Sequence, residues 1–437
     1  MDKNKILKSN ISYGIIWKGI SLLFIYLTVP ILLEYLGKEY YGVWITIFTL
    51  LNAAYFMDMG ISLGVKNKLT EAIAKNDSVL AKTYISTAYF SISFIAIFML
   101  FFGIIFVLSF EMQSIFNTNI AERELKIILL LSMLLVFISI VLNIYKSLLS
   151  SFQKSAKVEL AMAIYQGFVF IQILMLPKII SNSLITVSLV YGITNIFIAL
   201  IFTGLFFTRN KQLFPSYAYF KKDKIKEILG LGINFFIIQI ALIIILTTDN
   251  LIITYLIGPE ATTTYSIVNK IFQPFIIIST FIFAPLWTLY TNAYYNKDFK
   301  WIKNTLIRLN QLFIILIFAL ILLYFNFNWI IKFWIPQSLN YSNTLIALLS
   351  LFVLIKVYGD IYMTFLNGIG KIKLQMWLFI FGALINIPLS VLFVKYFNLG
   401  SSGVILATCI SLGILVIAMP IQTFKVLKKA KKITQIV

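Results

Sequence analysis

Histidine is absent from this 437-residue chain, and Cys409 is its only cysteine. No disulfide can form within the chain, and zinc sites built on histidine or cysteine ligands are excluded. Nucleophilic catalysis of the Ser-His-Asp or Cys-His type is also excluded, because its base is missing. Any proton coupling must therefore use carboxylates.

Charged residues are scarce as well. They make up 12% of the chain, against about a quarter in an ordinary soluble domain, whereas 60% of the residues are apolar. So few charges could not keep a body of this size in solution, and the soluble classes are excluded. The charge is also one-sided, because 36 basic and 16 acidic residues give a formal net charge of +20. In a soluble protein that charge would suggest nucleic acid binding.

The apolar residues fall into long runs. A membrane-spanning helix needs about 20 mostly apolar residues, and no run alternates with the period of two that β-barrel strands show. The sequence therefore predicts an all-α integral membrane protein with twelve transmembrane helices. They are expected at residues 11–33, 40–64, 83–110, 124–149, 158–180, 184–208, 228–256, 262–293, 303–325, 341–367, 373–395 and 401–424.

The loops between these helices alternate in charge. Loops on one side carry 27 of the basic residues, loops on the other side carry six, and three lie within helices. Because an excess of lysine and arginine marks cytoplasmic loops, both termini are predicted to be cytoplasmic. An even number of helices agrees with this. The basic end at residues 425–432 would meet anionic lipid.

A polar stretch in the middle of the sequence predicts two halves. We expect an N-terminal six-helix bundle at residues 1–208, a basic cytoplasmic linker at 209–227, and a C-terminal six-helix bundle with a basic cytoplasmic tail at 228–437. Six helices in each half would give the halves the same orientation in the membrane.

A weak internal repeat supports this division. A shift of 221 residues places YLGKEYYGVW (35–44) on LIGPEATTTY (256–265), so that Gly37 meets Gly258. Both segments would form the outward turn between the first two helices of a half. We interpret the halves as a parallel repeat, and transporters often place their substrate between such halves.

Three stretches carry a family resemblance. They are FMDMGISLGVKNKLTEAIAKND (56–77), TTDNLIITYLIGPEATTTYSIVNKIF (247–272) and FLNGIGKIKLQMWLFIFGALINIPLSVLFVKYFNLGSSGVILAT (365–408). Together they resemble the Wzx-like O-antigen and polysaccharide flippases of the multidrug/oligosaccharidyl-lipid/polysaccharide (MOP) exporter superfamily. The chain departs from the family in ATTTY, where a glycine is common before the tyrosine.

The resemblance implies a function and an architecture. Such proteins move an undecaprenyl-pyrophosphate-linked oligosaccharide from the inner to the outer leaflet of the bacterial cytoplasmic (inner) membrane, for O-antigen, capsule or other surface polysaccharide. Like the multidrug (MATE-like) exporters, they have two six-helix bundles around a V-shaped cavity with alternating access. The implied protein is not an enzyme and needs no cofactor, but a proton or sodium gradient could drive it. Its expected partners are the lipid-linked oligosaccharide, membrane lipids and polysaccharide polymerase or assembly proteins, with no nucleic acid.

Two other functions compete with that of a flippase. A multidrug or small-cation antiporter of the same fold is the alternative, and the charge count within the membrane does not separate the two. An integral-membrane glycosyl or acyl transferase is disfavoured, because the predicted outward loops are short and histidine is absent. The sequence leaves open the identity of the glycan, the coupling ion and the oligomeric state.

Six ionisable residues are predicted to lie within the helices, where a charge costs about 2.5–3.5 kcal/mol. The lysines are candidates to bind the pyrophosphate head group, and the aspartates are candidates to hold the lysines or to bind a coupling ion. Metal ligands are not predicted. The candidates are Lys18, Lys270 and Lys356, with Asp58, Asp249 and Asp360.

Their depths suggest three opposite-charge pairs. Residues at equal distance from a hairpin turn lie at equal depth, which would pair Lys18 with Asp58 and Asp249 with Lys270. Residues four apart share a helix face, which would pair Lys356 with Asp360. Competing interpretations are that Lys18 extends to the interface, that Asp58 ends its helix near the head groups, and that the last pair is purely local.

Two further features concern helix ends and bends. Glu159 lies at a helix start, where the macrodipole favours an acid, and we interpret it as structural. Pro274 and Pro285 lie within the predicted eighth helix. A proline removes a helix hydrogen bond, so this helix is expected to bend or break.

Overall fold

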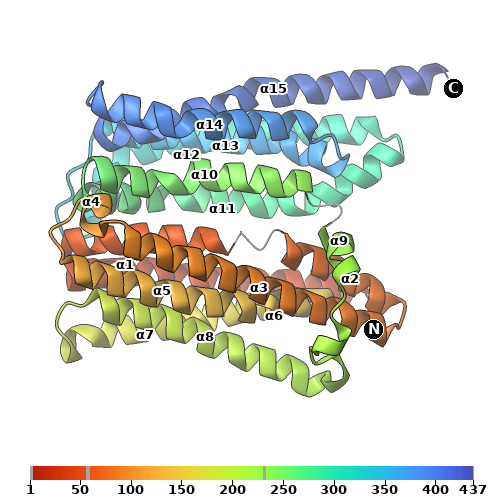
Figure 1. Ribbon diagram of the computed structural model, residues 1–437. Helices are drawn as coiled ribbons and strands as arrows, with labels where there is room; N and C mark the ends of the chain where they lie inside the picture. Colours follow the sequence, from red (N-terminus) through yellow and green to blue (C-terminus); the bar gives the residue numbers. More distant parts are fainter. Residues whose placement is uncertain (1–2, 56–59, 230–232, 437) are drawn as a thin grey trace. The chain divides into compact units, whose positions relative to one another are not determined.

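The computed structural model describes residues 3–55, 60–229 and 233–436, and all regular structure in these ranges is helical (Figure 1). Two short 3₁₀ turns, η1 (Lys211–Leu213) and η2 (Tyr217–Tyr219), accompany the α-helices. The helices are α1 (Lys3–Ala54), α2 (Ile61–Ala74), α3 (Ser78–Ser109), α4 (Met112–Phe116), α5 (Glu122–Leu142), α6 (Ile144–Ser151), α7 (Ser155–Ile179), α8 (Leu184–Arg209), α9 (Lys222–Leu229), α10 (Ile233–Leu256), α11 (Pro259–Tyr295), α12 (Phe299–Trp334), α13 (Asn343–Gly368), α14 (Lys373–Lys395) and α15 (Gly400–Ile436).

Eleven helices of the described chain are long and apolar enough to cross a membrane. The first of these spans, Ser12–Ala54, has 43 residues. A straight helix of that length would measure about 65 Å, twice the hydrocarbon thickness of about 30 Å. It is interrupted at Gly37, whose backbone is not helical, so it covers the first two predicted spans. The prediction of an all-α membrane protein with twelve crossing segments is confirmed.

Several predicted boundaries are wrong. The second span, expected at 40–64, ends at Ala54, and α2 is a separate helix of 14 residues. Helix α12 continues to Trp334, because Phe327 and Ile331 extend its buried face. The loop between α12 and α13 is therefore shorter than the interval between the predicted spans 303–325 and 341–367.

The chain forms two compact units, Met1–Phe236 and Ile237–Val437. In the first unit α1 packs on α7, and α5 packs on both α3 and α8. In the second unit α13 packs on α11, α12 and α15, and α14 packs on α15. Cys409 of α15 is buried there, and its Sγ lies 3.6 Å from the carbonyl oxygen of Leu348 on α13.

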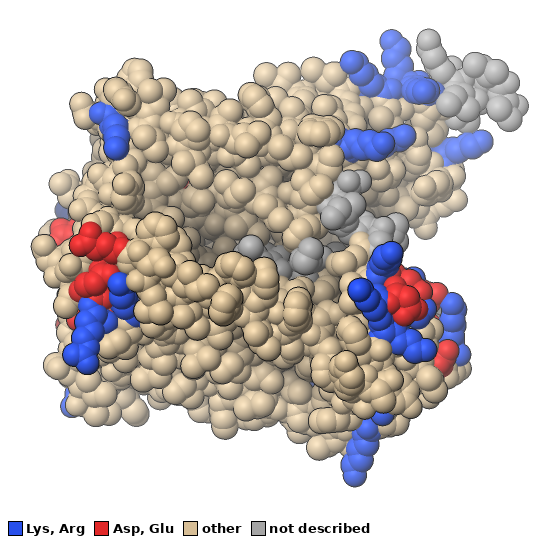
Figure 2. All heavy atoms as spheres, in the orientation of Figure 1, with Lys and Arg blue, Asp and Glu red and all other residues tan. Residues whose placement is uncertain are grey.

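Charged side chains on the visible face of the first unit gather at the two ends of its helices (Figure 2). One group lies over α4 and the start of α5, where Lys126 pairs with Glu122 at 3.1 Å. The other lies over α2 and α9. The apolar belt between the groups is the surface that a membrane-spanning unit requires.

The two glycines aligned by the repeat have matching backbone conformations. Gly37 has φ 74° and ψ 171°, and Gly258 has φ 126° and ψ 163°. This region is essentially restricted to glycine. Each glycine separates the first two long helices of its unit, which agrees with the parallel repeat.

Alanine at either glycine is expected to destabilise the protein by about 1–3 kcal/mol. A Cβ atom would meet no other atom within 4 Å at Gly37 or Gly258, so the cost is backbone strain. Gly204, inside α8, also has open space around its Cβ position and is the matched control. Alanine there should be neutral or stabilising by up to about 1 kcal/mol. Thermal unfolding of the purified variants measures the difference, and equal effects at all three positions would contradict the strain argument.

The segment between α8 and α10 is fastened to α3 within the first unit. The hydroxyl of Tyr84 donates to Glu227 Oε2 at 2.7 Å, and Lys224 Nζ lies 2.5 Å from the other oxygen of that carboxylate. The side-chain oxygens of Ser86 and Thr87 accept hydrogen bonds from backbone N–H groups of the segment. The Lys224 ammonium and the Tyr84 hydroxyl hold the pKa of Glu227 below its usual range.

Replacing Tyr84 with phenylalanine is expected to weaken this attachment by about 1.5 kcal/mol, because the hydrogen bond goes to a charged acceptor. The segment should then be cut by trypsin about tenfold faster at neutral pH. Tyr219→Phe is the matched control, because it removes a hydroxyl from the same segment and keeps the ring that Lys82 Nζ contacts at 4.6 Å from the centroid. Since the pKa of Glu227 is lowered in the folded state, its contribution is present above about pH 4.3 and is lost as the pH falls further. A variant that is cut no faster than the control would contradict this attachment.

Candidate functional site

Lys356 and Asp360 form the predicted pair on α13. Lys356 Nζ lies 2.7 Å from Asp360 Oδ1 and 2.5 Å from Oδ2, so one ammonium contacts both carboxylate oxygens. Their side chains are 20% and 15% exposed. One helical turn separates them, which is the spacing that such a pair needs. Of the three pairs that the sequence suggests, this is the one that the described contacts form.

Asp249 of α10 lies in a polar cluster in the interior of the second unit. Only 4% of its surface is exposed. The hydroxyl of Tyr265 on α11 donates to its Oδ2 at 2.8 Å, and the hydroxyl of Thr408 on α15 donates to Oδ1 at 3.2 Å. The predicted pairing of Asp249 with Lys270 is therefore wrong. Two neutral hydroxyl groups bind the Asp249 carboxylate instead.

The cluster extends to a fourth helix through Asn386 of α14. Its Nδ2 donates to Thr408 at 3.1 Å and lies 3.5 Å from the hydroxyl oxygen of Ser411. Its Oδ1 is buried and has no hydrogen-bond partner within the described ranges. A carboxylate, the hydroxyl groups bound to it and a side-chain amide thus form one connected network inside the unit.

The electrostatics of this cluster are unbalanced. The ion pairs of the described chain do not include Asp249. An ionised carboxylate buried without a counter-charge is costly. The cluster is therefore suited to hold a proton or a small cation on Asp249, and its oxygen atoms are the ligand type that hard cations prefer.

Lys270 lies on α11, one turn beyond Ser266. Its Nζ contacts the Ser266 hydroxyl oxygen at 3.3 Å, and the side chain is half-buried. Pro274 and Pro285 follow on the same helix, which runs through both prolines without interruption. The expectation that the prolines break the helix is wrong, and the bend stays a prediction. Because Pro274 has no amide hydrogen, the carbonyl oxygen of Lys270 lacks its usual helix hydrogen bond.

Lys18 of α1 lies in the first unit near an acid that the sequence assigned to structure alone. Its Nζ is 3.7 Å from Glu159 Oε2 on α7. Lys146 lies on α6 and interacts electrostatically with both residues. Two lysines and one glutamate therefore share this region. The proposed partner Asp58 lies outside the described residues.

The sequence missed the neighbours of the aspartate cluster. Tyr265, Asn386 and Thr408 carry no charge, and nothing in their local sequence distinguishes them from other polar residues in apolar helices. For Tyr265 the only sequence signal was its position in the repeated segment that aligns Gly258 with Gly37, five residues after Glu260.

A family model described as polysaccharide biosynthesis protein matches residues 7–290, which is more than half of the chain. The chain belongs to the polysaccharide biosynthesis protein family. A second model, described as MatE, matches residues 235–392. Both matches confirm the resemblance to MOP-superfamily flippases.

Relatives and solved structures agree with this membership. A Salmonella typhi protein named as an O-antigen transporter is 25% identical over 81% of each chain. A Yersinia pseudotuberculosis protein named as an O-antigen export protein is 25% identical over 82% of each chain. An inward-facing multidrug resistance MATE family transporter matches with a TM-score of 0.77 and 16% identity, covering 96% of this chain and 99% of that one. A MOP superfamily transporter from Pyrococcus furiosus has a TM-score of 0.63 at 16% identity and covers 99% of each chain.

For this member of the polysaccharide biosynthesis protein family, the fold is that of the MATE transporters. It is a multi-pass bacterial membrane protein. At 16% identity the structural likeness shows the fold alone. The substrate must therefore be inferred from the protein's own residues and from its named relatives.

Proposed function

We propose that this protein is a flippase that moves a lipid-linked oligosaccharide repeat unit, carried on undecaprenyl pyrophosphate, from the inner to the outer leaflet. The observation that carries this proposal is the polysaccharide biosynthesis match over residues 7–290. The relatives named for O-antigen transport or export, which cover about four-fifths of the chain, support it. Transport would proceed by alternating access and would make or break no covalent bond.

The membrane lysines have a definite task in this proposal. A pyrophosphate head group carries about two negative charges, and its transfer through a low-dielectric region is costly. Lys18, Lys270 and Lys356 would offset that cost. Glu159 and Asp360 contact Lys18 and Lys356, so these two lysines would stay compensated when no substrate is bound. Exchange of these partners for pyrophosphate gives the differential binding that a two-state transporter requires.

The Asp249 cluster would couple transport to an ion gradient. A carboxylate inside a membrane bundle is the usual carrier of protons in pumps and transporters, and the surrounding oxygen atoms would suit a sodium ion equally. Binding of either cation neutralises the buried charge. We therefore assign the driving ion to this cluster and the head group to the lysines.

Deletion of the gene tests the proposal directly. Loss of surface glycan and accumulation of lipid-linked oligosaccharide facing the cytoplasm are expected, with both restored by the wild-type gene. The alternative is a multidrug or small-cation antiporter, which the MatE match over residues 235–392 favours. Increased drug sensitivity with intact surface glycan would select the antiporter and reject the flippase.

A further inference from the structure

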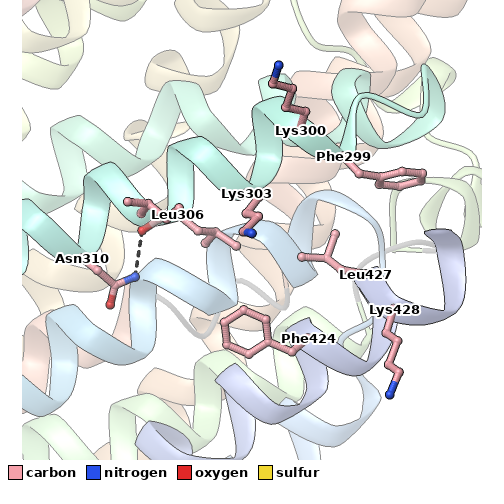
Figure 3. A pocket seen from close by; sticks show the side chains of 9 residues that line it. Phe299, Lys300, Lys303, Leu306, Asn310, Phe424, Leu427 and Lys428 are labelled. Atoms are coloured by element: carbon pink, nitrogen blue, oxygen red, sulfur yellow. Dashed lines mark hydrogen bonds between the residues drawn. The ribbon is translucent and has the colours of Figure 1, made fainter.

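A groove in the second unit lies between α12 and α15 and has a volume of about 770 Å³. It is lined by residues of these two helices alone, so it belongs to a single compact unit (Figure 3). Three of its lining residues are lysines, and most of the others are apolar. The lysines are Lys300 and Lys303 on α12 and Lys428 on α15.

The local sequence explains the rim of lysines. Asp298 caps α12, where its Oδ1 accepts a hydrogen bond from the N–H of Trp301 at 3.0 Å. Lys300 and Lys303 follow in the first turns of the helix, three residues apart and therefore on neighbouring faces. In Figure 3 the ammonium group of Lys303 lies between the two helices, while the side chains of Lys300 and Lys428 extend outward from the rim.

The walls below the rim are apolar. Leu306 and Ile307 line the α12 side, and Phe424 and Leu427 line the α15 side. Phe424 is 56% exposed and Ile307 is 47% exposed. An apolar surface of this kind below a cationic rim matches a molecule with an anionic head and an apolar tail.

Two of the lining residues, Asn310 and Phe424, contact the same tyrosine of a neighbouring helix. Tyr362 of α13 donates to Asn310 Oδ1 at 3.3 Å, and its ring centroid lies 6.2 Å from that of Phe424. Tyr362 thereby joins both walls. Ten residues of α12 separate Lys300 from Asn310, so the groove extends about 15 Å along the helix. That length accommodates a substantial part of an acyl chain.

The part of the chain that the structure describes leaves the charge around the groove largely uncompensated. Residues 237–437 contain fifteen lysines and arginines and four acidic residues. None of the three rim lysines takes part in the ion pairs of the described chain. The acid beside the rim, Asp298, already caps α12. An anion placed at the rim therefore meets several positive charges and little repulsion.

We propose that this groove binds an anionic phospholipid, with its phosphate between Lys303 and Lys428 and one acyl chain against Leu306, Ile307 and Phe424. Basic pockets between membrane helices are suited to anionic head groups. A free phosphate ion would use the rim and leave the apolar walls exposed, so the walls favour a lipid. The residues that line the groove do not include the lysines or the aspartate cluster assigned to transport.

Binding to the purified full-length protein tests this proposal. Dioleoylphosphatidylglycerol, dioleoylphosphatidylcholine and inorganic phosphate are titrated in detergent, with thermal stability and native mass spectrometry as readouts. We expect phosphatidylglycerol to raise the unfolding temperature and to stay bound, and the other two to do neither. The double variant Lys303→Gln and Lys428→Gln should weaken phosphatidylglycerol binding about 25-fold, or about fivefold for each lysine.

A matched control removes two lysines elsewhere in the same unit. The control variant is Lys332→Gln with Lys395→Gln, because these lysines lie in the last turns of α12 and α14. It should change phosphatidylglycerol binding less than twofold. Equal response to the neutral lipid, or equal loss in the control, would overturn the proposal. Binding of a polyprenyl pyrophosphate without binding of phosphatidylglycerol would also overturn it. None of these outcomes depends on transport, so the flippase proposal is tested separately.

Discussion

Replacing Asp249 with asparagine is expected to reduce glycan transport about 100-fold, within the usual range of a coupling free energy, while the protein stays folded in the membrane. Asparagine keeps the shape of the side chain and can still hydrogen-bond Tyr265 and Thr408. It removes the negative charge on which a proton or sodium ion would bind. Because the carboxylate is buried without an ion-pair partner, loss of its charge should leave the unfolding temperature unchanged or raise it.

The measurement is transfer of lipid-linked oligosaccharide in vesicles with an imposed proton or sodium gradient. Asp298→Asn is the matched control, because asparagine caps a helix as well as aspartate does and Asp298 lies at the start of α12. Thr408→Val, which removes one hydroxyl from the carboxylate, should have an intermediate effect. Gradient-driven transport at the wild-type rate in Asp249→Asn would remove this cluster from the mechanism.

Replacing Lys356 with alanine is expected to reduce transport strongly without loss of protein from the membrane. The single change also leaves Asp360 without its ion-pair partner, at a cost of about 3 kcal/mol, the low end for a buried pair, since both side chains are partly exposed. Lower transport in this variant alone would therefore not separate substrate binding from stability.

A double variant, Lys356→Gln with Asp360→Asn, makes that separation. It removes both charges, so the unfolding temperature should return close to that of the wild type. If the lysine binds the pyrophosphate, transport stays low in the double variant, and the apparent affinity for the lipid-linked substrate falls. Recovery of transport together with stability would show that the pair is only a local helix contact and would exclude Lys356 from head-group binding.

The sequence predicted the fold class because membrane burial imposes a simple rule. A run of about 20 apolar residues has few alternatives to a spanning helix, so the segments were found even where their ends were wrong. The predicted helix ends were wrong where tertiary packing determines the end of the helix. Phe327 and Ile331 extend α12 because they are buried against the rest of the second unit. Apolar composition alone does not distinguish that burial from a loop at the interface.

The candidate site was predictable in part. Lys356 and Asp360 were paired correctly because their contact is local and follows from helix geometry. Asp249 and Lys270 were paired by depth, which fixes the height of a residue but not the direction in which its side chain points. The contacts of Asp249 come from positions 16 and 159 residues away in the chain. Such partners depend on the packing of four helices, which one sequence does not reveal.

The buried position of Cys409 has a practical consequence. The residue is 3% exposed, its thiol lies against the carbonyl of Leu348, and the chain has no other cysteine. The wild-type protein should therefore react slowly with maleimides, so it already serves as a background for single-cysteine labelling. Cysteines introduced at Lys300 and Lys332, on opposite ends of α12, would report which side of the membrane each end faces. Pairs of spin labels, one in each unit, would then test whether the distance between the units changes during transport.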